Sequence, residues 1–135
     1  MLAADLAALD FCYVTTTGRT TGQSHRIEIW FAAADDARER IYLLAGGRER
    51  ADWVRNLRAH PAVRVEIGER TFDGTARAIE GEPDAAAARR LVFEKYRTRD
   101  DLDAWRDAAL PVAIDLRAEH AAVSARRWRT RPSVG

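Results

Sequence analysis

The stretch that decides the fold of this chain reads Val14-Thr15-Thr16-Thr17-Gly18-Arg19-Thr20-Thr21-Gly22-Gln23-Ser24-His25-Arg26-Ile27-Glu28-Ile29-Trp30-Phe31. Residues 11–17, which lead into its loop, are aromatic and β-branched, as is typical of a pleated strand with one covered face. Residues 25–34 after the loop alternate, with Ile27, Ile29 and Phe31 on one face. The stretch therefore predicts two strands joined by a polar, glycine-containing loop.

The loop between these strands combines groups that bind anions. Gly18 and Gly22 bracket the sequence Arg19-Thr20-Thr21, and glycine lets the backbone approach a ligand closely and tolerates positive φ. Backbone N–H groups, hydroxyls and the guanidinium groups of Arg19 and Arg26 together favour an anion cradle. A hairpin loop that is polar only for solubility is the alternative. No helix pattern follows the loop, so it is neither a Walker loop nor a dinucleotide fingerprint.

Length and composition indicate a globular chain with balanced charge. The chain has 135 residues, of which 47% are hydrophobic, and we expect residues 1–135 to form one domain with its own core. The net charge of +1 is too small to favour nucleic acid or a membrane surface as a partner. No basic leader and no long apolar run are present, so we expect a cytoplasmic location without integral membrane association.

Cysteine and histidine usage argues against disulfide and metal chemistry. Cys12 is the single cysteine, so an intrachain disulfide is impossible. Its apolar strand favours a buried core position, with a reactive thiol as the alternative. His25, His60 and His120 are scattered without ligand spacing, so we expect no metal site. The basic stretch 126–131 is interpreted as a solvated terminus or an interface strand rather than a nucleic-acid site.

The rest of the chain predicts more strands and a few peripheral helices. We expect strands at 40–45, 62–67, 71–80, 110–117 and 122–128, a helix from residue 48 to Pro61, a helix starting near Pro83, a short helix carrying Leu102 and Trp105, an N-terminal arm or helix at 2–10 and a frayed tail at 129–135. This order predicts a mainly β fold with peripheral helices, in which six or seven strands form one antiparallel, barrel-like sheet.

Several of these motifs, in this order and spacing, resemble the deazaflavin-dependent nitroreductase family. The segments that carry the resemblance are Thr15-Thr16-Thr17-Gly18-Arg19-Thr20-Thr21-Gly22-Gln23, the strand ending Trp30-Phe31, Leu43-Leu44-Ala45-Gly46-Gly47, Asp52-Trp53-Val54-Arg55-Asn56-Leu57-Arg58-Ala59-His60-Pro61-Ala62-Val63 and Thr71-Phe72-Asp73-Gly74-Thr75-Ala76. The family uses coenzyme F420 and is related to the flavin- and pyridoxamine-phosphate-oxidase-like split β-barrels. The resemblance covers about residues 11–116.

The resemblance implies a split β-barrel (FMN-binding-like), usually a homodimer, that binds F420 in a groove beside the barrel. It implies hydride transfer from the reduced deazaflavin to a small organic acceptor, which is a quinone, a nitro compound or an activated C=C bond. The cofactor carries the chemistry of hydride transfer, so an obvious catalytic dyad is not required. Two alternatives stay open: an FMN-dependent oxidoreductase of the same fold, and a non-catalytic protein that binds a cofactor or an apolar ligand.

In that family the Gly-Arg-x-x-Gly loop holds the phosphate and acidic tail of the coenzyme, and the turn after the third strand lies near a helix N-terminus that favours anions. Carried over, the cofactor-binding residues are Arg19, Thr20, Thr21, Gly22, Gln23, Arg26, Ala45, Gly46, Gly47, Arg48, Trp53 and Asn56. Tyr96 is the one candidate for a catalytic proton donor, with packing on the barrel as the alternative. The sequence departs from the family at Thr20, where lysine is common, and at the acidic Glu28.

Overall fold

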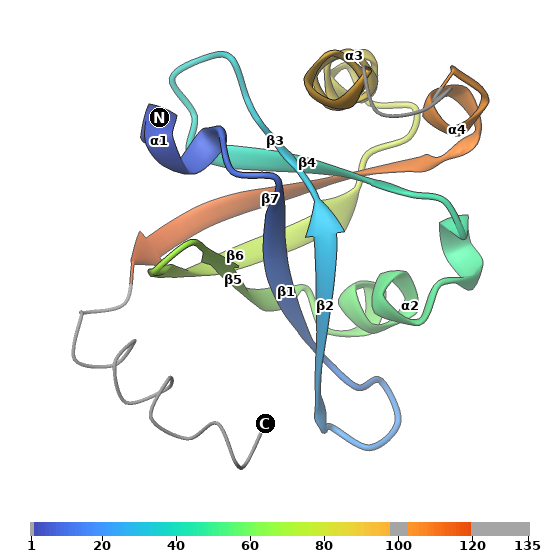
Figure 1. Ribbon diagram of the computed structural model, residues 1–135. Helices are drawn as coiled ribbons and strands as arrows, with labels where there is room; N and C mark the ends of the chain where they lie inside the picture. Colours follow the sequence, from blue (N-terminus) through green and yellow to red (C-terminus); the bar gives the residue numbers. More distant parts are fainter. Residues whose placement is uncertain (1, 98–102, 120–135) are drawn as a thin grey trace.

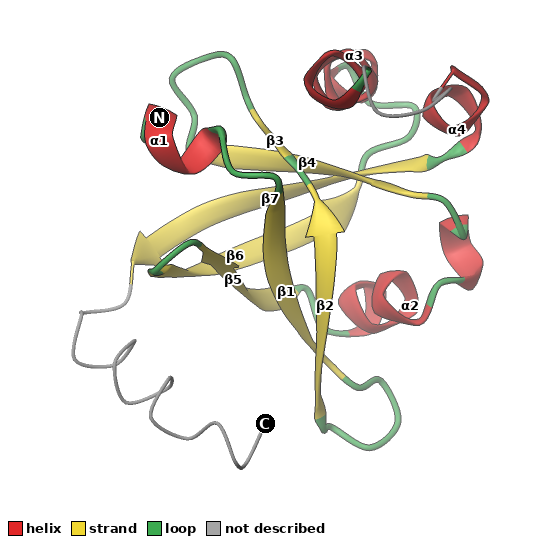
Figure 2. Cartoon of the chain, in the orientation of Figure 1, coloured by secondary structure: helices red, strands yellow, loops and turns green. Residues whose placement is uncertain are grey.

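The chain folds into a strongly curved antiparallel sheet with helices on its outside (Figures 1 and 2). This computed structural model describes residues 2–97 and 103–119. Its elements are α1 (Ala4–Ala7), β1 (Phe11–Thr17), β2 (Ser24–Trp30), β3 (Ala32–Ala33), β4 (Arg40–Ala45), η1 (Arg48–Arg50), α2 (Asp52–Ala59), β5 (Ala62–Ile67), β6 (Arg70–Ala78), α3 (Asp84–Tyr96), α4 (Asp103–Ala108) and β7 (Leu110–Glu119). The strand and tail expected at 122–128 and 129–135, and Leu102, lie outside the described residues.

The seven strands form one sheet in the order β2-β1-β5-β6-β7-β4-β3, and every pairing is antiparallel. The strands at the two ends of this order, β2 and β3, are neighbours in the chain and are separated only by Phe31. The chain therefore joins the two edges of the sheet, which gives the half-barrel of Figure 1. The predicted fold class, a mainly β split barrel with peripheral helices, is confirmed.

The single strand predicted at 25–34 is wrong, because the chain changes partner strand at Phe31. β2 pairs with β1, whereas β3 pairs with β4. Two side chains of α3 bind the main chain of Phe31 at this break between β2 and β3. The Phe31 N–H donates to the Tyr96 hydroxyl at 3.2 Å, and the Lys95 ammonium donates to the Phe31 carbonyl at 2.9 Å. Two residues far along the chain therefore fix the bend that closes the barrel.

The helix predicted from residue 48 to Pro61 is interrupted at Ala51. A 3₁₀ turn, η1, precedes the break, and Ala51 is extended at φ −64° and ψ 135° before α2 begins. Arg48, the first residue of η1, has a φ of 52° in the left-handed region, so it is not part of a right-handed helix either. α2 ends as expected, since His60 is extended before Pro61.

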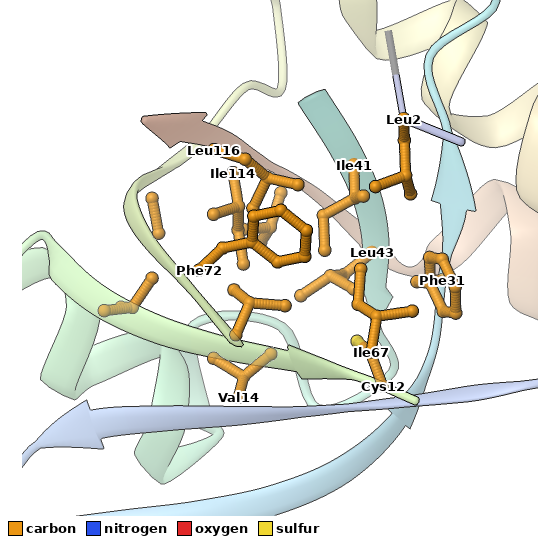
Figure 3. Packing of buried hydrophobic residues seen from close by; sticks show 14 of the residues in the cluster. Leu2, Cys12, Val14, Phe31, Ile41, Leu43, Ile67, Phe72, Ile114 and Leu116 are labelled. Carbon is orange, nitrogen blue, oxygen red and sulfur yellow. The ribbon is translucent and has the colours of Figure 1, made fainter. Parts of the chain in front are cut away.

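Two hydrophobic layers lie on opposite sides of the sheet. The interior of the barrel is filled by a cluster that includes Val14, Phe31, Leu43 and Ile114 (Figure 3). A second cluster packs β4 and β7 against α3 and α4. Cys12 belongs to the interior cluster with 0% exposure, and burial raises the pKa of its thiol to about 12. Its predicted core position is therefore confirmed. Among the described residues, no helix has the length and apolar character to cross a membrane.

An ion-pair network fixes the N-terminus of α3 to β4 and β7. The Arg40 side chain is 9% exposed and contacts Asp84 and Asp115, each at 2.5 Å. Tyr42 donates its hydroxyl to the same Asp84 oxygen at 2.9 Å, and Arg38 approaches it at 2.8 Å. These hydrogen bonds, from Tyr42 and Arg38, hold the pKa of the Asp84 carboxyl below its ordinary value of 3.8.

Asp84 is expected to make stability depend on pH in the acid range. Its pKa is depressed in the folded state, so its stabilisation is present above the unfolded value of 3.8 and is lost as pH falls further. Asp84→Asn should cost about 1–2 kcal/mol at neutral pH, and the gap to the wild type should close below about pH 4. Urea unfolding from pH 7 to pH 3 measures this. Asp35→Asn, on an exposed pair with Arg90, is the control. A constant gap at every pH would contradict the assignment.

Candidate functional site

The loop between β1 and β2 is closed on itself by main-chain hydrogen bonds. The Gly18 N–H donates to the Gln23 carbonyl at 2.7 Å, and the Gly22 N–H donates to the Gly18 carbonyl at 2.9 Å. Gly22 has a φ of 75°, which glycine adopts without strain. At Gly18, a Cβ atom would lie 2.9 Å from His25 Nε2. Both glycines therefore allow a compact loop whose outer residues are exposed.

Arg19 attaches this loop to α2. Its backbone N–H and its Nη1 atom both donate to Asn56 Oδ1, at 3.1 and 2.8 Å. Its Nη2 atom contacts Asp52 Oδ1 at 3.3 Å, in the first turn of α2. Asn56 is 2% exposed and donates its own Nδ2 to Thr16 Oγ1 at 3.2 Å. Asn56 is therefore a buried bracket, by which we mean a side chain on α2 whose hydrogen bonds connect this helix to β1 and to the loop.

The groups at this junction suit an anion. The Arg19 side chain is 34% exposed, and its acidic partner Asp52 is 85% exposed and open to water. Within the part of the chain that the structure describes, the backbone N–H groups of Thr20 and Thr21 have no acceptor. α2 begins after Ala51 without a side-chain cap, so its first N–H groups and its positive dipole end are available. A phosphate or carboxylate fits this set of donors.

The turn after β4 connects this junction to α4. Ala45 is buried at the end of β4, and a Cβ on Gly46 would lie 3.3 Å from Trp105 Nε1. Arg48 donates from Nη1 to the Ala108 carbonyl at 2.6 Å and pairs with Glu80. The turn therefore touches α4 at one end and leads through η1 into α2 at the other.

An open groove of about 370 Å³ lies beside this turn, and aromatic side chains form its walls. Its lining residues are Phe11, Glu28, Ile29, Trp30 and Trp105. The Trp30 ring stacks on Tyr96 with ring centroids 4.3 Å apart and planes at 3°. Trp105 meets Trp30 edge to face at 5.9 Å. This apolar groove fits a flat conjugated ring, because aromatic walls offer both dispersion contact and stacking.

Arg26 lies apart from the Arg19 junction. Its guanidinium sits 4.0 Å above the Tyr13 ring and pairs with both oxygens of Glu66, at 2.9 and 3.2 Å. Tyr13 and Thr16 point to opposite faces of β1, because side chains alternate along a strand. Arg26 is therefore on the face opposite Asn56, and the structure does not bring it to the loop–α2 junction.

Tyr96 is buried behind Trp30 with 0% exposure. Its hydroxyl donates to the main-chain carbonyl of Asp10 at 2.6 Å and accepts the Phe31 N–H at 3.2 Å. The hydroxyl proton is thus directed into the protein. We assign Tyr96 to the support of Trp30, and no proton-donating step is assigned to it below.

The other residues that the resemblance assigns fall in several environments. Thr20, Thr21, Gly22 and Gln23 are exposed on the loop. Trp53 is half-buried and packs against the barrel interior and the small cluster around Ala45, outside the groove lining. In the described ranges 2–97 and 103–119, no group of three metal-ligating side chains is found.

Sequence reasoning missed two walls of the groove, Phe11 and Trp105. From the sequence, Phe11 is predicted only as a strand residue. In the structure it is 41% exposed, whereas most large hydrophobic side chains of the described residues are buried or half-buried. Trp105 lies 75 positions after Trp30 in the sequence. Their contact depends on the packing of α4 near the end of β2, which a local sequence pattern does not predict. A signal was available only in the tryptophans themselves, since large aromatic residues are common at binding sites.

Comparison with known proteins identifies the family of the chain. Residues 2–117 match the family of F420H2-dependent quinone reductases. The chain belongs to this family. The family match covers most of the chain, and the resemblance drawn from its motifs is thereby confirmed. The family is named after quinones as electron acceptors, not after nitro compounds.

Curated and solved relatives are more distant. An F420H2-dependent quinone reductase of Mycobacterium tuberculosis is 29% identical over 85 residues, which is 62% of this chain and 57% of that protein. The match thus spans little more than half of the relative's length. A conserved hypothetical protein of M. tuberculosis shares the fold at a TM-score of 0.66 and 23% identity, covering 88% of this chain and 83% of its own. An F420H2-dependent reductase has a TM-score of 0.61 at 24% identity, covering 80% and 94%.

Proposed function

We propose that this member of the F420H2-dependent quinone reductase family binds F420 at the junction of the β1–β2 loop and α2, and reduces a quinone in the aromatic groove. The observation that carries the proposal is the groove walled by Phe11, Trp30 and Trp105, beside a turn that leads to the anion-binding junction. Family membership supports the choice of F420 and of a quinone.

The junction matches the anionic part of the coenzyme. Arg19, the N–H groups of Thr20 and Thr21, and the uncapped start of α2 would hold a phosphate or carboxylate. The proposal does not use Arg26, which lies on the opposite face of β1 and pairs with Glu66, or Arg48, which pairs with Glu80 and the Ala108 carbonyl. The absence of the family's common lysine at Thr20 leaves Arg19 as the main positive charge of the loop.

The groove matches the flat acceptor. When bound, reduced F420 supplies a hydride, and the quinone takes up the hydride's electron pair and proton together with a second proton to become a hydroquinone. The protein's task is to hold the acceptor ring between Trp30, Trp105 and Phe11 and to keep it oriented. Tyr96 fixes the plane of Trp30 by stacking on it. The second proton comes from solvent, which reaches the open groove.

Arg19→Ala is expected to weaken F420 binding about 10- to 100-fold, because a charge-assisted hydrogen bond is worth about 1.5–3 kcal/mol. A fluorescence titration with F420, and separately with FMN, measures this. Arg77→Ala removes an exposed arginine of another ion pair and is the matched control. Unchanged F420 affinity in a folded Arg19→Ala protein would exclude the junction as the anion site, and binding of FMN alone would move the protein to flavin chemistry.

The proposal extends to assembly and location. We propose a homodimer in the cytoplasm that acts on a small-molecule substrate and requires neither nucleic acid nor an integral membrane segment. β2 is the last strand of the sheet on its side, and an exposed strand edge gains from being covered by a second subunit. Sedimentation analysis tests this, since a dimer has twice the 15.1 kDa mass of the chain.

A further inference from the structure

A single carboxylate faces the aromatic groove. Glu28 is exposed on β2 and, among the residues that the structure describes, is the one charged side chain that lines the groove, next to Trp30 and Trp105. Its Oε2 atom accepts a hydrogen bond from the Tyr13 hydroxyl at 2.6 Å. That bond and the charge of Glu28 raise the pKa of Tyr13, because both favour the protonated phenol.

The nearby positive charge is already engaged by another acid. Arg26 stacks on the Tyr13 ring, but its Nε and Nη2 atoms donate to the two oxygens of Glu66, whose side chain is 12% exposed. Within residues 2–97 and 103–119, no arginine, lysine or histidine nitrogen lies within ion-pair distance of Glu28. The cluster of Arg26, Glu66 and Glu28 therefore carries one net negative charge, which Glu28 presents to the groove.

The walls of the groove add to this negative potential. The faces of tryptophan and phenylalanine rings attract cations through their quadrupole, and a carboxylate at the same place reinforces that attraction. An anionic ring in the groove would instead be repelled by the Glu28 carboxylate. The charge pattern thus separates two ends of the site: the junction pairs Arg19 with Asp52, whereas the groove carries the Glu28 carboxylate.

We propose that Glu28 makes the groove selective for planar aromatic acceptors that carry a positive charge, and that it discriminates against anionic ones. The inference rests on the proposed function in one respect, that the groove is where the acceptor binds. Glu28 acts here as a specificity-determining residue, and the hydride transfer itself is unchanged by it.

The test uses three naphthalene probes of one size, which are trimethyl(naphthylmethyl)ammonium, naphthylmethanol and naphthalenesulfonate. Calorimetric titration into the wild-type protein should rank them in that order, with about tenfold between the cation and the anion, as expected for one partly solvated charge contact. Glu28→Gln should remove most of this ratio and leave the affinity for naphthylmethanol within about twofold. Raising the ionic strength should compress the wild-type ranking in the same way.

A control and a second readout separate this inference from the proposed function. Glu82→Gln makes the same charge change at an ion pair with Arg77, outside the groove lining, and should leave the ranking intact. Turnover of F420H2 is then measured with neutral, ammonium-bearing and sulfonated naphthoquinones, and each rate is compared between wild type and Glu28→Gln. A ranking that survives in Glu28→Gln, or that is absent in the wild type, overturns the selectivity. If the wild-type protein ranks the three naphthalene probes as expected but does not oxidise F420H2 with any quinone, the proposed function is overturned and the charge selectivity of the groove stands.

Discussion

Trp30→Ala is expected to lower kcat/KM for quinone reduction by about 30-fold or more, the size of effect seen when a central aromatic anchor worth about 2 kcal/mol is removed. Trp30 is both a wall of the groove and the neighbour of the other aromatic residues, since it stacks on Tyr96 and meets Trp105 edge to face. Its loss removes the surface on which an acceptor ring lies and frees Trp105 from its edge contact.

Steady-state kinetics with F420H2 and a neutral naphthoquinone measure the Trp30 effect. Trp30→Phe keeps an aromatic face and should recover most of the activity, which separates groove shape from general damage. F420 affinity should change little in either variant, because the anion-binding junction is at Arg19. Full activity of Trp30→Ala would mean that the acceptor binds elsewhere.

Asn56→Leu should lower the free energy of unfolding by about 3–4 kcal/mol. This is the sum of a neutral hydrogen bond, a charge-assisted hydrogen bond to Arg19, and the cost of leaving the buried Thr16 hydroxyl without a partner. Asn56 accepts from the Arg19 backbone and guanidinium and donates to Thr16, which is 1% exposed. Leucine fills a similar volume but satisfies none of these groups. The loop then loses its attachment to α2, so F420 binding should weaken as well.

Urea unfolding gives the stability change of Asn56→Leu, and an F420 titration gives the binding change. Asn56→Asp is the matched variant: it keeps acceptors for Arg19 and for the Thr16 hydroxyl, so it should lose less stability. A loss below about 1 kcal/mol for Asn56→Leu would show that the buried bracket contributes no more than an exposed contact.

Local patterns predicted most of the strands because each strand shows its own period. The hairpin at residues 11–17 and 24–30, and strand 62–67, follow alternation that can be read within a few residues. The break at Phe31 could not be predicted in this way. It depends on Lys95 and Tyr96, which reach Phe31 only after α3 has packed on the sheet.

The candidate site was predictable in part, for the same physical reason. Arg19 and the hydroxyls that follow it share one loop, so their common function is visible in the sequence. The role of Asn56 as a buried bracket depends on the packing of α2 against β1. Arg26 and Arg19 are close in the sequence, but strand alternation places Arg26 on the opposite face. The groove depends on Trp105 from α4, far from Trp30 in the chain.

The most direct test of the central claim is a single-turnover experiment in which protein loaded with F420H2 is mixed without oxygen with a neutral naphthoquinone. The account predicts that oxidised F420 appears at a rate that depends on quinone concentration and that falls about 30-fold or more in Trp30→Ala. If the wild-type protein binds F420H2 but leaves it reduced at saturating quinone, the assignment of quinone reduction to this groove is contradicted.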